Sequence, residues 1–242
     1  MKKKTQPKLM DIHTHILPGA DDGAKDMQEA LSLVRLAWDN GTTGIVLTPH
    51  HRGTFKNDPD SLRERFLLFQ KAVHREVPKM KLRLGCEIRY QSDVPQKIQQ
   101  GALLTMCDSR YVLLEFASTA FRSHIISAIW ECEDIDKIPI IAHAERYDAF
   151  HQDASLVDEV LRMGARIQLN ADSIMGKCGF RVKRLCHKLL KAKKVHFVAS
   201  DAHDIKYRRP VLLPCYNRVC KKYGEEYAKQ LFWYNPRALT EK

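Results

Sequence analysis

Histidines and carboxylic acids recur in this sequence at one place in a repeating pattern, directly after short apolar runs. In chain order the series is His13 and His15, His50, Glu87, Glu115, His143, Asn170, and Asp201 with His203. Neutral imidazole and ionised carboxylate are the protein ligands that divalent metal ions accept. Gathering such groups in a protein interior costs free energy unless something compensates their polarity. The series therefore predicts a cluster of divalent metal ions.

The apolar runs that precede these residues are the candidate strands that must position them. They cover residues 9–15, 44–48, 81–88, 110–116, 138–144, 165–171 and 195–201. Between them apolar residues fall at helical spacing, most clearly within 27–38, 62–73, 125–130 and 156–161. Alternating strands and helices predict parallel strands with helical crossovers. Seven such units favour one α/β domain over residues 1–242, folded as a TIM-like barrel that is complete or slightly irregular. A doubly wound open sheet is the alternative, although no Gly-x-Gly-x-x-Gly follows the first strand.

Strand alternation adds an expectation about side-chain direction. Asp11, His13 and His15 are two residues apart, so they should point to one side, while Ile12 and Thr14 point to the other. The same spacing joins Asp201 to His203 and His143 to Glu145. In a parallel barrel all these positions meet at the C-terminal face, where the active sites of such barrels lie.

Composition limits the partners and the compartment. The 242 residues include 40 Lys and Arg against 29 Asp and Glu, so the net charge is 40 − 29 = +11. Such a charge favours anionic partners without choosing among them. Residues 1–8 form a basic tail, and no apolar run before Asp11 resembles a signal peptide. Seven cysteines, an odd number, include no Cys-x-x-Cys pair, which favours a reduced, cytoplasmic protein.

Several ordered motifs resemble those of the PHP superfamily (polymerase and histidinol phosphatase). They are Asp11-Ile-His-Thr-His15, Thr48-Pro-His-His51, Gly85-Cys-Glu-Ile88, Leu114-Glu-Phe116, Ala142-His-Ala-Glu-Arg146 and Ser200-Asp-Ala-His203. The Asp-Asp-Gly at 21–23 and the Leu-Glu-Phe at 114–116 narrow the resemblance. They are similar to the manganese-dependent protein-tyrosine phosphatases of Gram-positive capsule and exopolysaccharide operons. The resemblance runs from Asp11 to Pro236, nearly the whole chain.

This resemblance implies a distorted seven-stranded barrel that holds three divalent ions, manganese in preference to iron or zinc. It assigns His13, His15, Glu87 and Asp201 to one ion. Glu87 bridges to a second ion, which Glu115 and His143 complete. His50, His203 and either Asp21 or Asp22 hold the third. Ala144 stands where the family usually has proline, and the ligand beside it is expected to be unaffected.

The resemblance also implies the reaction, hydrolysis of phosphotyrosine by a metal-bound hydroxide. Arg146 matches an arginine that binds the substrate phosphate, and either Arg208 or Arg209 is a second candidate. Asp201 and His203 join Arg146 as candidate catalytic residues, with His203 or a metal-bound water protonating the phenolate. The implied substrate is a membrane-associated tyrosine kinase that regulates capsular or exopolysaccharide synthesis.

Other functions remain open at this stage. One alternative is a small-molecule phosphatase of the histidinol-phosphatase type, and another is a PHP-type nuclease module. No basic stripe interleaved with aromatics is present, so no stable nucleic-acid complex is expected. Cys178 and Arg184 have the Cys-x5-Arg spacing of cysteine-dependent tyrosine phosphatases, but the apolar spacing of 180–189 favours a helix there. The sequence leaves open the oligomeric state, a homo-oligomer included.

Overall fold

The computed structural model describes residues 7–153 and 155–241, so most of the expected basic tail lies outside the described residues. The strands are β1 (Leu9–Thr14), β2 (Thr42–Leu47), β3 (His50–Arg52), β4 (Phe55–Lys56), β5 (Lys81–Leu84), β6 (Glu87–Arg89), β7 (Tyr111–Glu115), β8 (Ile138–Ile141), β9 (Arg166–Asn170) and β10 (Phe197–Ala199). They form a three-stranded sheet, β1-β2-β5, and a seven-stranded sheet, β10-β9-β8-β7-β6-β3-β4. All the pairings are parallel except that of β3 with β4.

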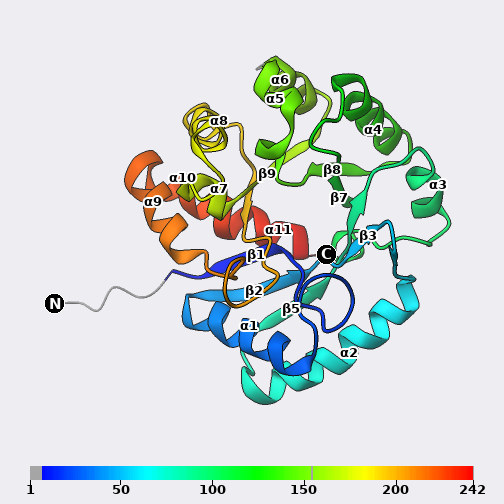
Figure 1. Ribbon diagram of the computed structural model, residues 1–242, viewed down its shortest axis with the longest axis vertical. Coiled ribbons are helices and arrows are strands. Elements are labelled where there is room, and N and C mark those ends of the chain that lie inside the picture. The colour runs from blue at the N-terminus through cyan, green and yellow to red at the C-terminus, as the bar shows by residue number, and fades with distance from the viewer. Residues whose placement is uncertain (1–6, 154, 242) are drawn as a thin grey trace.

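Helices surround the strands (Figure 1). They are α1 (Met27–Asp39), α2 (Pro59–Glu76), α3 (Val94–Gln99), α4 (Arg122–Asp134), α5 (Asp148–Gln152), α6 (Ser155–Arg162), α7 (Ala171–Met175), α8 (Phe180–Lys191), α9 (Leu213–Tyr223), α10 (Glu225–Lys229) and α11 (Asn235–Thr240). Two 3-10 turns, Met106–Asp108 and Ala144–Arg146, and a π-helical turn, Gln230–Tyr234, complete the elements. Among the described residues, no helix has both the length and the apolar character that crossing a membrane requires.

The two long helices on the α1–α2 flank begin at the kind of residue that helix ends require. The Asp26 side chain accepts a hydrogen bond from the backbone N–H of Glu29 and so caps α1. Asp58 does the same for α2 through Ser61, and Pro59 occupies the first turn, where its missing N–H costs nothing. These caps fix where the chain leaves the loops that follow β1 and β4.

The expected strand–helix alternation is confirmed, but the expected strand count is not. The run 81–88 is two strands, because the chain is interrupted at Gly85 and Cys86. A Cβ on Gly85 would lie 2.8 Å from Met106 Sδ, so the backbone passes too close to its neighbour for a larger residue. The second predicted run, 44–48, lies within or next to β2, and the short strands β3 and β4 follow it after Thr48 and Pro49. The described residues therefore contain ten strands where seven uninterrupted ones were predicted.

Both faces of the sheets are buried. Alternate residues of β7 belong to different cores, with Val112 and Leu114 in the larger one, which the helices cover, and Leu113 in a smaller one. The smaller core also holds Met10, Ile12, Val46, Ile140, Phe197 and, from α11, Leu239. An isolated parallel bridge joins Thr14 at the end of β1 to Ala202 after β10. This bridge brings the residues that follow the first and last strands together.

Candidate metal centre

Eight of the predicted ligands are buried side chains at or just beyond the carboxyl ends of the strands. They are His13, His15, His50, Glu87, Glu115, His143, Asp201 and His203. Two of them, His143 and Asp201, have positive φ values of 33° and 56°. Non-glycine residues adopt this left-handed conformation at a cost, and it often marks functional sites. The backbone is therefore bent where the chain turns these side chains inward.

The group predicted for the first ion is assembled. The Nε2 atoms of His13 and His15 lie 3.1 Å apart. Each lies 3.3 Å from one oxygen of Glu87, and they lie 3.6 and 3.4 Å from Asp201 Oδ1. The two imidazoles and two carboxylates thus converge on one point.

The group predicted for the second ion lies beside it. His143 Nε2 is 2.8 Å from Glu87 Oε1 and 4.0 Å from Glu115 Oε1. His50 also approaches this side, with its Nδ1 atom 2.7 Å from Glu87 Oε2. Glu87 therefore lies close to the imidazoles of both groups.

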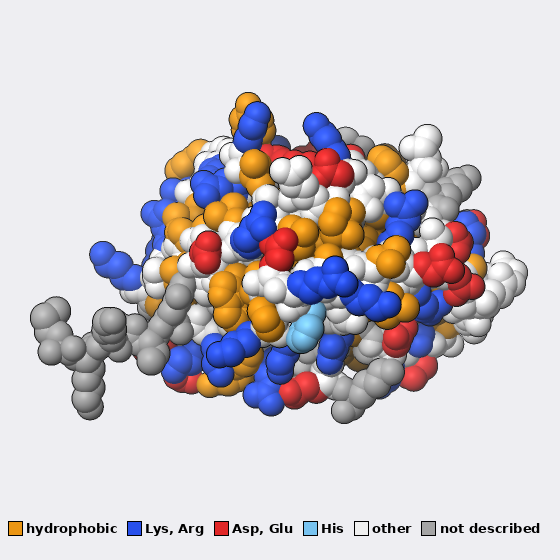
Figure 2. All heavy atoms as spheres, turned by 90° about the horizontal axis from the view of Figure 1, so that it is seen from below, with side chains coloured by type: hydrophobic (Ala, Val, Ile, Leu, Met, Phe, Trp, Pro, Cys, Tyr) orange, Lys and Arg blue, Asp and Glu red, His pale blue; other side chains and the backbone are white. Residues whose placement is uncertain are grey.

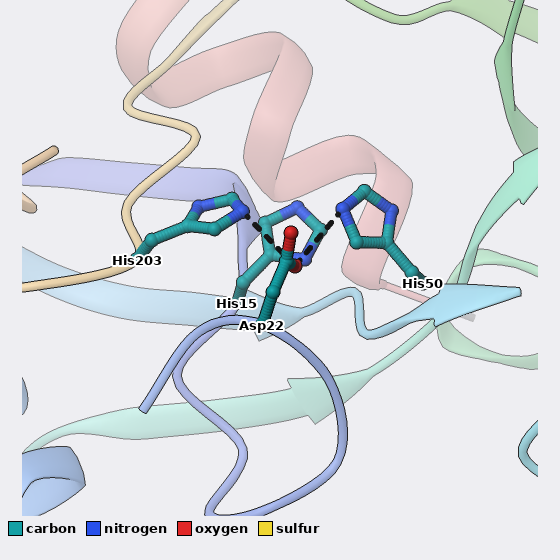
Figure 3. A group of neighbouring side chains, drawn as sticks. All are labelled: His15, Asp22, His50 and His203. Carbon is teal, nitrogen blue, oxygen red and sulfur yellow. Dashed lines mark ion pairs between the residues drawn. The ribbon is translucent and has the colours of Figure 1, made fainter. Parts of the chain in front are cut away.

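For the third predicted ion, the distances show which of Asp21 and Asp22 lies close to His50 and His203. Asp22 Oδ1 lies 3.4 Å from His50 Nε2 and 3.5 Å from His203 Nε2, and His15 lies close by (Figure 3). Asp21 instead accepts hydrogen bonds from His15 Nδ1 at 2.7 Å, the backbone N–H of His50 and that of Gly23. Asp22 is therefore the aspartate available as a ligand, and Asp21 holds His15 in place.

The Nδ1 atoms of His13 and His15 each have a hydrogen-bond partner. His13 Nδ1 lies 3.1 Å from Gln168 Oε1, which also accepts the backbone N–H of His143, so His13 Nδ1 carries the hydrogen. His15 Nδ1 likewise donates to Asp21. Neutral His13 and His15 would then direct Nε2 lone pairs at each other and at carboxylates, an arrangement that only a cation or added protons can stabilise.

Several buried polar atoms of the cluster make no hydrogen bond among the described residues, and this also indicates a metal site. Glu87 Oε2, Glu115 Oε2 and His203 Nε2 are buried and make no hydrogen bond of good geometry among the described residues. Their neighbours are other ionisable groups, at 2.7 Å for His50 Nδ1, 3.4 Å for Arg89 Nε and 3.5 Å for Asp22 Oδ1 respectively. Buried polar groups normally have partners, so each such exception calls for an explanation. Imidazole nitrogens and carboxylate oxygens that face one another fit a set of bound divalent cations.

The pKa values of the ionisable groups in the cluster depend on burial and on the neighbouring charges. Burial lowers the pKa of His15, but Asp21, with Asp201 and Glu87, outweighs this effect and raises it well above its ordinary value. Burial raises the pKa of Glu87, but His13 and the other imidazoles bring it well below its ordinary value. Burial, His15 and Arg208 lower the pKa of His203 to about 2.

The raised pKa of His13 and of His15 leads to a prediction about stability. Their protonated forms stabilise the metal-free protein below the ordinary histidine pKa, and this contribution is lost as the pH rises through the raised folded-state pKa. Metal ions require the deprotonated imidazoles. Added manganese should therefore raise the melting temperature more at about pH 9 than at about pH 6. Thermal unfolding of chelator-treated protein with and without manganese measures this, and an equal or smaller increase at the higher pH would contradict it.

Two parts of the alternation argument are wrong. Asp11 does not join His13 and His15, since its Oδ1 atom accepts hydrogen bonds from the backbone of Ser200 and His13 and fastens β1 to the end of β10. The register of β1 against β2 is also irregular between Asp11 and Thr14. Glu145 does not join His143, because residues 144–146 leave the strand as a 3-10 turn, and its carboxylate accepts the N–H of Asn170. Asn170 in turn donates to Asp201 Oδ2.

Arginines border the cluster on two sides. Arg146 Nη1 lies 3.1 Å and Arg208 Nη2 lies 2.6 Å from different oxygens of Asp201, whereas Arg209 is an exposed residue with no side-chain contact to the cluster. On the other side, Arg52 contacts Glu115 and Asp22, and Arg89 contacts Glu115.

Sequence reasoning missed Arg52, Arg89 and Gln168. Each lies two residues from a member of the strand-end series, namely His50, Glu87 and Asn170. The same alternation that grouped His13 with His15 would have placed them on the site's face.

The Cys178-x5-Arg184 spacing does not form a phosphate loop. Phe180–Lys191 is the predicted helix, so Arg184 lies within α8 and Cys178 is an exposed thiol just before it. The exposed cysteine therefore stands apart from the buried histidine and carboxylate cluster.

The sequence and the fold match known proteins over nearly their whole length. Residues 9–241 match the family model for capsular polysaccharide synthesis, CpsB/CapC. The chain belongs to the CpsB/CapC family. It is 32% identical to the tyrosine-protein phosphatase CpsB of Streptococcus pneumoniae, over 96% of this chain and 98% of that protein. It is 35% identical to the putative tyrosine-protein phosphatase CapC of Staphylococcus aureus, over 90% and 86% of the two chains.

A solved structure agrees with this placement. The work on YwqE of Bacillus subtilis and CpsB of S. pneumoniae, described as metal-dependent tyrosine phosphatases, includes a structure that superposes with a TM-score of 0.90 at 32% identity. The match covers 96% of this chain and 94% of the other. The narrower resemblance drawn from residues 21–23 and 114–116 is thereby confirmed.

Proposed function

We propose that this CpsB/CapC family member is a metal-dependent protein-tyrosine phosphatase. The observation that carries the proposal is the buried cluster of imidazoles and carboxylates, with Arg146 and Arg208 at its edge. A cluster of metal ligands beside two guanidinium groups suits a phosphate ester, whose oxygens both bind readily. Relatives with the printed name tyrosine-protein phosphatase support the choice of phosphotyrosine.

The cluster is proposed to hold three divalent ions, manganese in preference to iron or zinc. His13, His15, Glu87 and Asp201 hold the first ion, and Glu87, Glu115 and His143 hold the second. The third is held by His50, His203 and Asp22, with Asp21 in a supporting position. The short distances within each group support these sets, as do the buried atoms Glu87 Oε2 and His203 Nε2, which make no hydrogen bond of good geometry among the described residues.

Divalent ions bound here would lower the pKa of water toward neutrality and polarise the phosphoryl group. Arg146 and Arg208 orient the phosphate, because each guanidinium can give two parallel N–H groups to two oxygens. Asp201 holds both arginines in position through its two oxygens. The phenolate of tyrosine has a pKa near 10, so it can leave with little help from an acid.

The proposed framework is a single domain with a distorted barrel. The bridge from Thr14 to Ala202 supports closure between β1 and β10. The barrel has seven strands if β2 with β3, and β5 with β6, each count as one interrupted strand and the short antiparallel strand β4 is left out. The ligands then lie at the C-terminal face, as barrel active sites do. Seven free cysteines support a reducing compartment, the cytoplasm.

The proposed substrate is a phosphotyrosine protein, namely a membrane-associated tyrosine kinase of the capsule or exopolysaccharide pathway. A substrate panel on manganese-loaded protein tests the chemical class. It contains a phosphotyrosine peptide, the matching phosphoserine peptide, histidinol phosphate and single-stranded DNA. We expect kcat/KM for the phosphotyrosine peptide to exceed the others by at least about 100-fold, or about 2.7 kcal/mol. Faster turnover of histidinol phosphate or DNA would replace the proposal with one of the alternatives.

A further inference from the structure

A basic cavity of about 510 Å³ lies at the amino ends of β1, β2 and β5. Its charged lining comprises Lys8, Lys79, Lys81, Arg83, Arg237 and Glu241, and Trp38 and Trp233 are among its other lining residues. The candidate metal centre follows the carboxyl ends of the same strands. The cavity is therefore at the other end of the strands and takes no part in the proposed reaction.

The positive charge in this cavity is largely uncompensated. Arg237 forms an ion pair with Glu241. Lys8, Lys79, Lys81 and Arg83 are exposed, and none of them makes an ion pair with another described residue. Four like charges gathered around a hollow repel one another and raise the local concentration of anions. A phosphate group fits this environment.

A second cavity, of about 660 Å³, adjoins the basic one and has apolar side chains on one part of its lining and polar ones, Asp108 among them, on the rest. The two share Arg83, Thr240 and Glu241 in their linings. Apolar side chains from α2, β5 and the loop after α3 line the second cavity, namely Phe66, Leu67, Leu82, Leu84 and Leu104. Leu67 and its neighbour Leu68 are 53% and 63% exposed. Figure 2, which shows the flank with α1 and α2, has Lys and Arg side chains with hydrophobic ones between them.

We propose that these joined cavities bind an anionic phospholipid of a membrane surface, with its phosphate among Lys79, Lys81 and Arg83 and its chain against Leu67 and Leu82. The half-buried indoles of Trp38 and Trp233 suit this position, because tryptophan favours the boundary between apolar and wet surroundings. A soluble phosphate compound would use the basic cavity alone and would leave the second cavity and the exposed leucines unexplained. Docked in this way, the protein directs the candidate metal centre away from the bilayer.

Binding of the full chain to vesicles measures the docking. We expect sedimentation with vesicles of phosphatidylglycerol mixed into phosphatidylcholine and none with phosphatidylcholine alone. Each basic side chain near an anionic surface contributes about fivefold in affinity, so Lys81→Gln with Arg83→Gln should weaken binding about 25-fold. Neither residue belongs to the proposed catalytic machinery. Unchanged turnover of a soluble phosphotyrosine peptide would therefore show that the variant folds.

A matched control variant distinguishes a specific lipid-binding site from general attraction between a basic protein and anionic vesicles. Lys188→Gln with Lys191→Gln removes the same charge from exposed positions on α8, whose side chains line neither cavity. This variant should lose less than about threefold in affinity. Equal losses in the two double variants would overturn the proposal, as would the absence of binding to anionic vesicles.

A calorimetric titration distinguishes lipid from soluble phosphate. A short-chain phosphatidylglycerol, below its micelle concentration, should bind at least about tenfold more tightly than glycerol phosphate or inorganic phosphate. Leu67→Gln should remove most of that difference without changing the affinity for glycerol phosphate. If glycerol phosphate binds as tightly as the lipid, the cavity takes a soluble phosphate compound and the membrane assignment is wrong.

Discussion

Replacing Glu87 by glutamine should reduce turnover of a phosphotyrosine peptide by about 1,000-fold, or about 4 kcal/mol. Glu87 is fully buried, and its two oxygens lie close to four imidazoles, those of His13, His15, His50 and His143. An amide retains the shape of this side chain but removes the charge that two ions would share. The substitution therefore disturbs two proposed metal sites at once.

Glu115→Gln is the matched comparison. Glu115 is at the edge of the cluster, shares its charge with Arg52 and Arg89, and serves one proposed ion. Its substitution should therefore cost less than that of Glu87. Elemental analysis of both variants should find fewer ions per chain in Glu87→Gln than in Glu115→Gln. An unchanged metal content in Glu87→Gln would reject the bridging position.

Arg146→Ala should slow turnover by about 30- to 1,000-fold, or roughly 2–4 kcal/mol, while the metal content stays the same. The Arg146 guanidinium contacts the outer oxygen of Asp201 and remains 37% exposed, so it can reach a phosphate from the solvent side. Its contact with the substrate strengthens as negative charge develops on the phosphoryl oxygens. Arg146→Lys should recover part of the rate, since a point charge cannot reproduce two parallel N–H groups.

The two arginines of the last loop provide the control for this prediction. Arg208 contacts Asp201 beside Arg146, so Arg208→Ala should also slow turnover. Arg209 has no contact with the cluster, so Arg209→Ala should stay within about threefold of the parent, under 1 kcal/mol. If Arg146→Ala also stays within threefold at full metal content, its phosphate role is rejected.

The order of elements and the positions of the candidate ligands could be predicted because each depends on a short stretch of sequence. An apolar run such as 110–116 specifies a strand, and the His or Glu at its end then follows from the parallel arrangement. Helical spacing in 27–38 and 62–73 predicts α1 and α2 for the same reason. The positions of the candidate ligands at the strand ends could therefore be predicted one residue at a time.

The remaining details depend on tertiary contacts that the sequence does not display. The Asp11 side chain accepts a hydrogen bond from the backbone of Ser200, near the other end of the chain, and simple alternation cannot foresee that contact or the irregular register of β1. The interruption at Gly85 depends on how closely Met106 packs against it. The choice between Asp21 and Asp22 depends on which carboxylate the loop after β1 directs at His15 Nδ1. Each of these is set by a neighbour that is distant in the sequence or by the path of a loop.

Phosphate release from a phosphotyrosine peptide, measured as manganese is added back to chelator-treated protein, tests the central claim most directly. Parent protein and Cys178→Ser should both be inactive after chelation and should both recover as manganese is restored, because the proposed chemistry depends on the buried cluster and not on the exposed thiol. Activity that persists in the chelated parent and disappears in Cys178→Ser would contradict the metal-dependent mechanism.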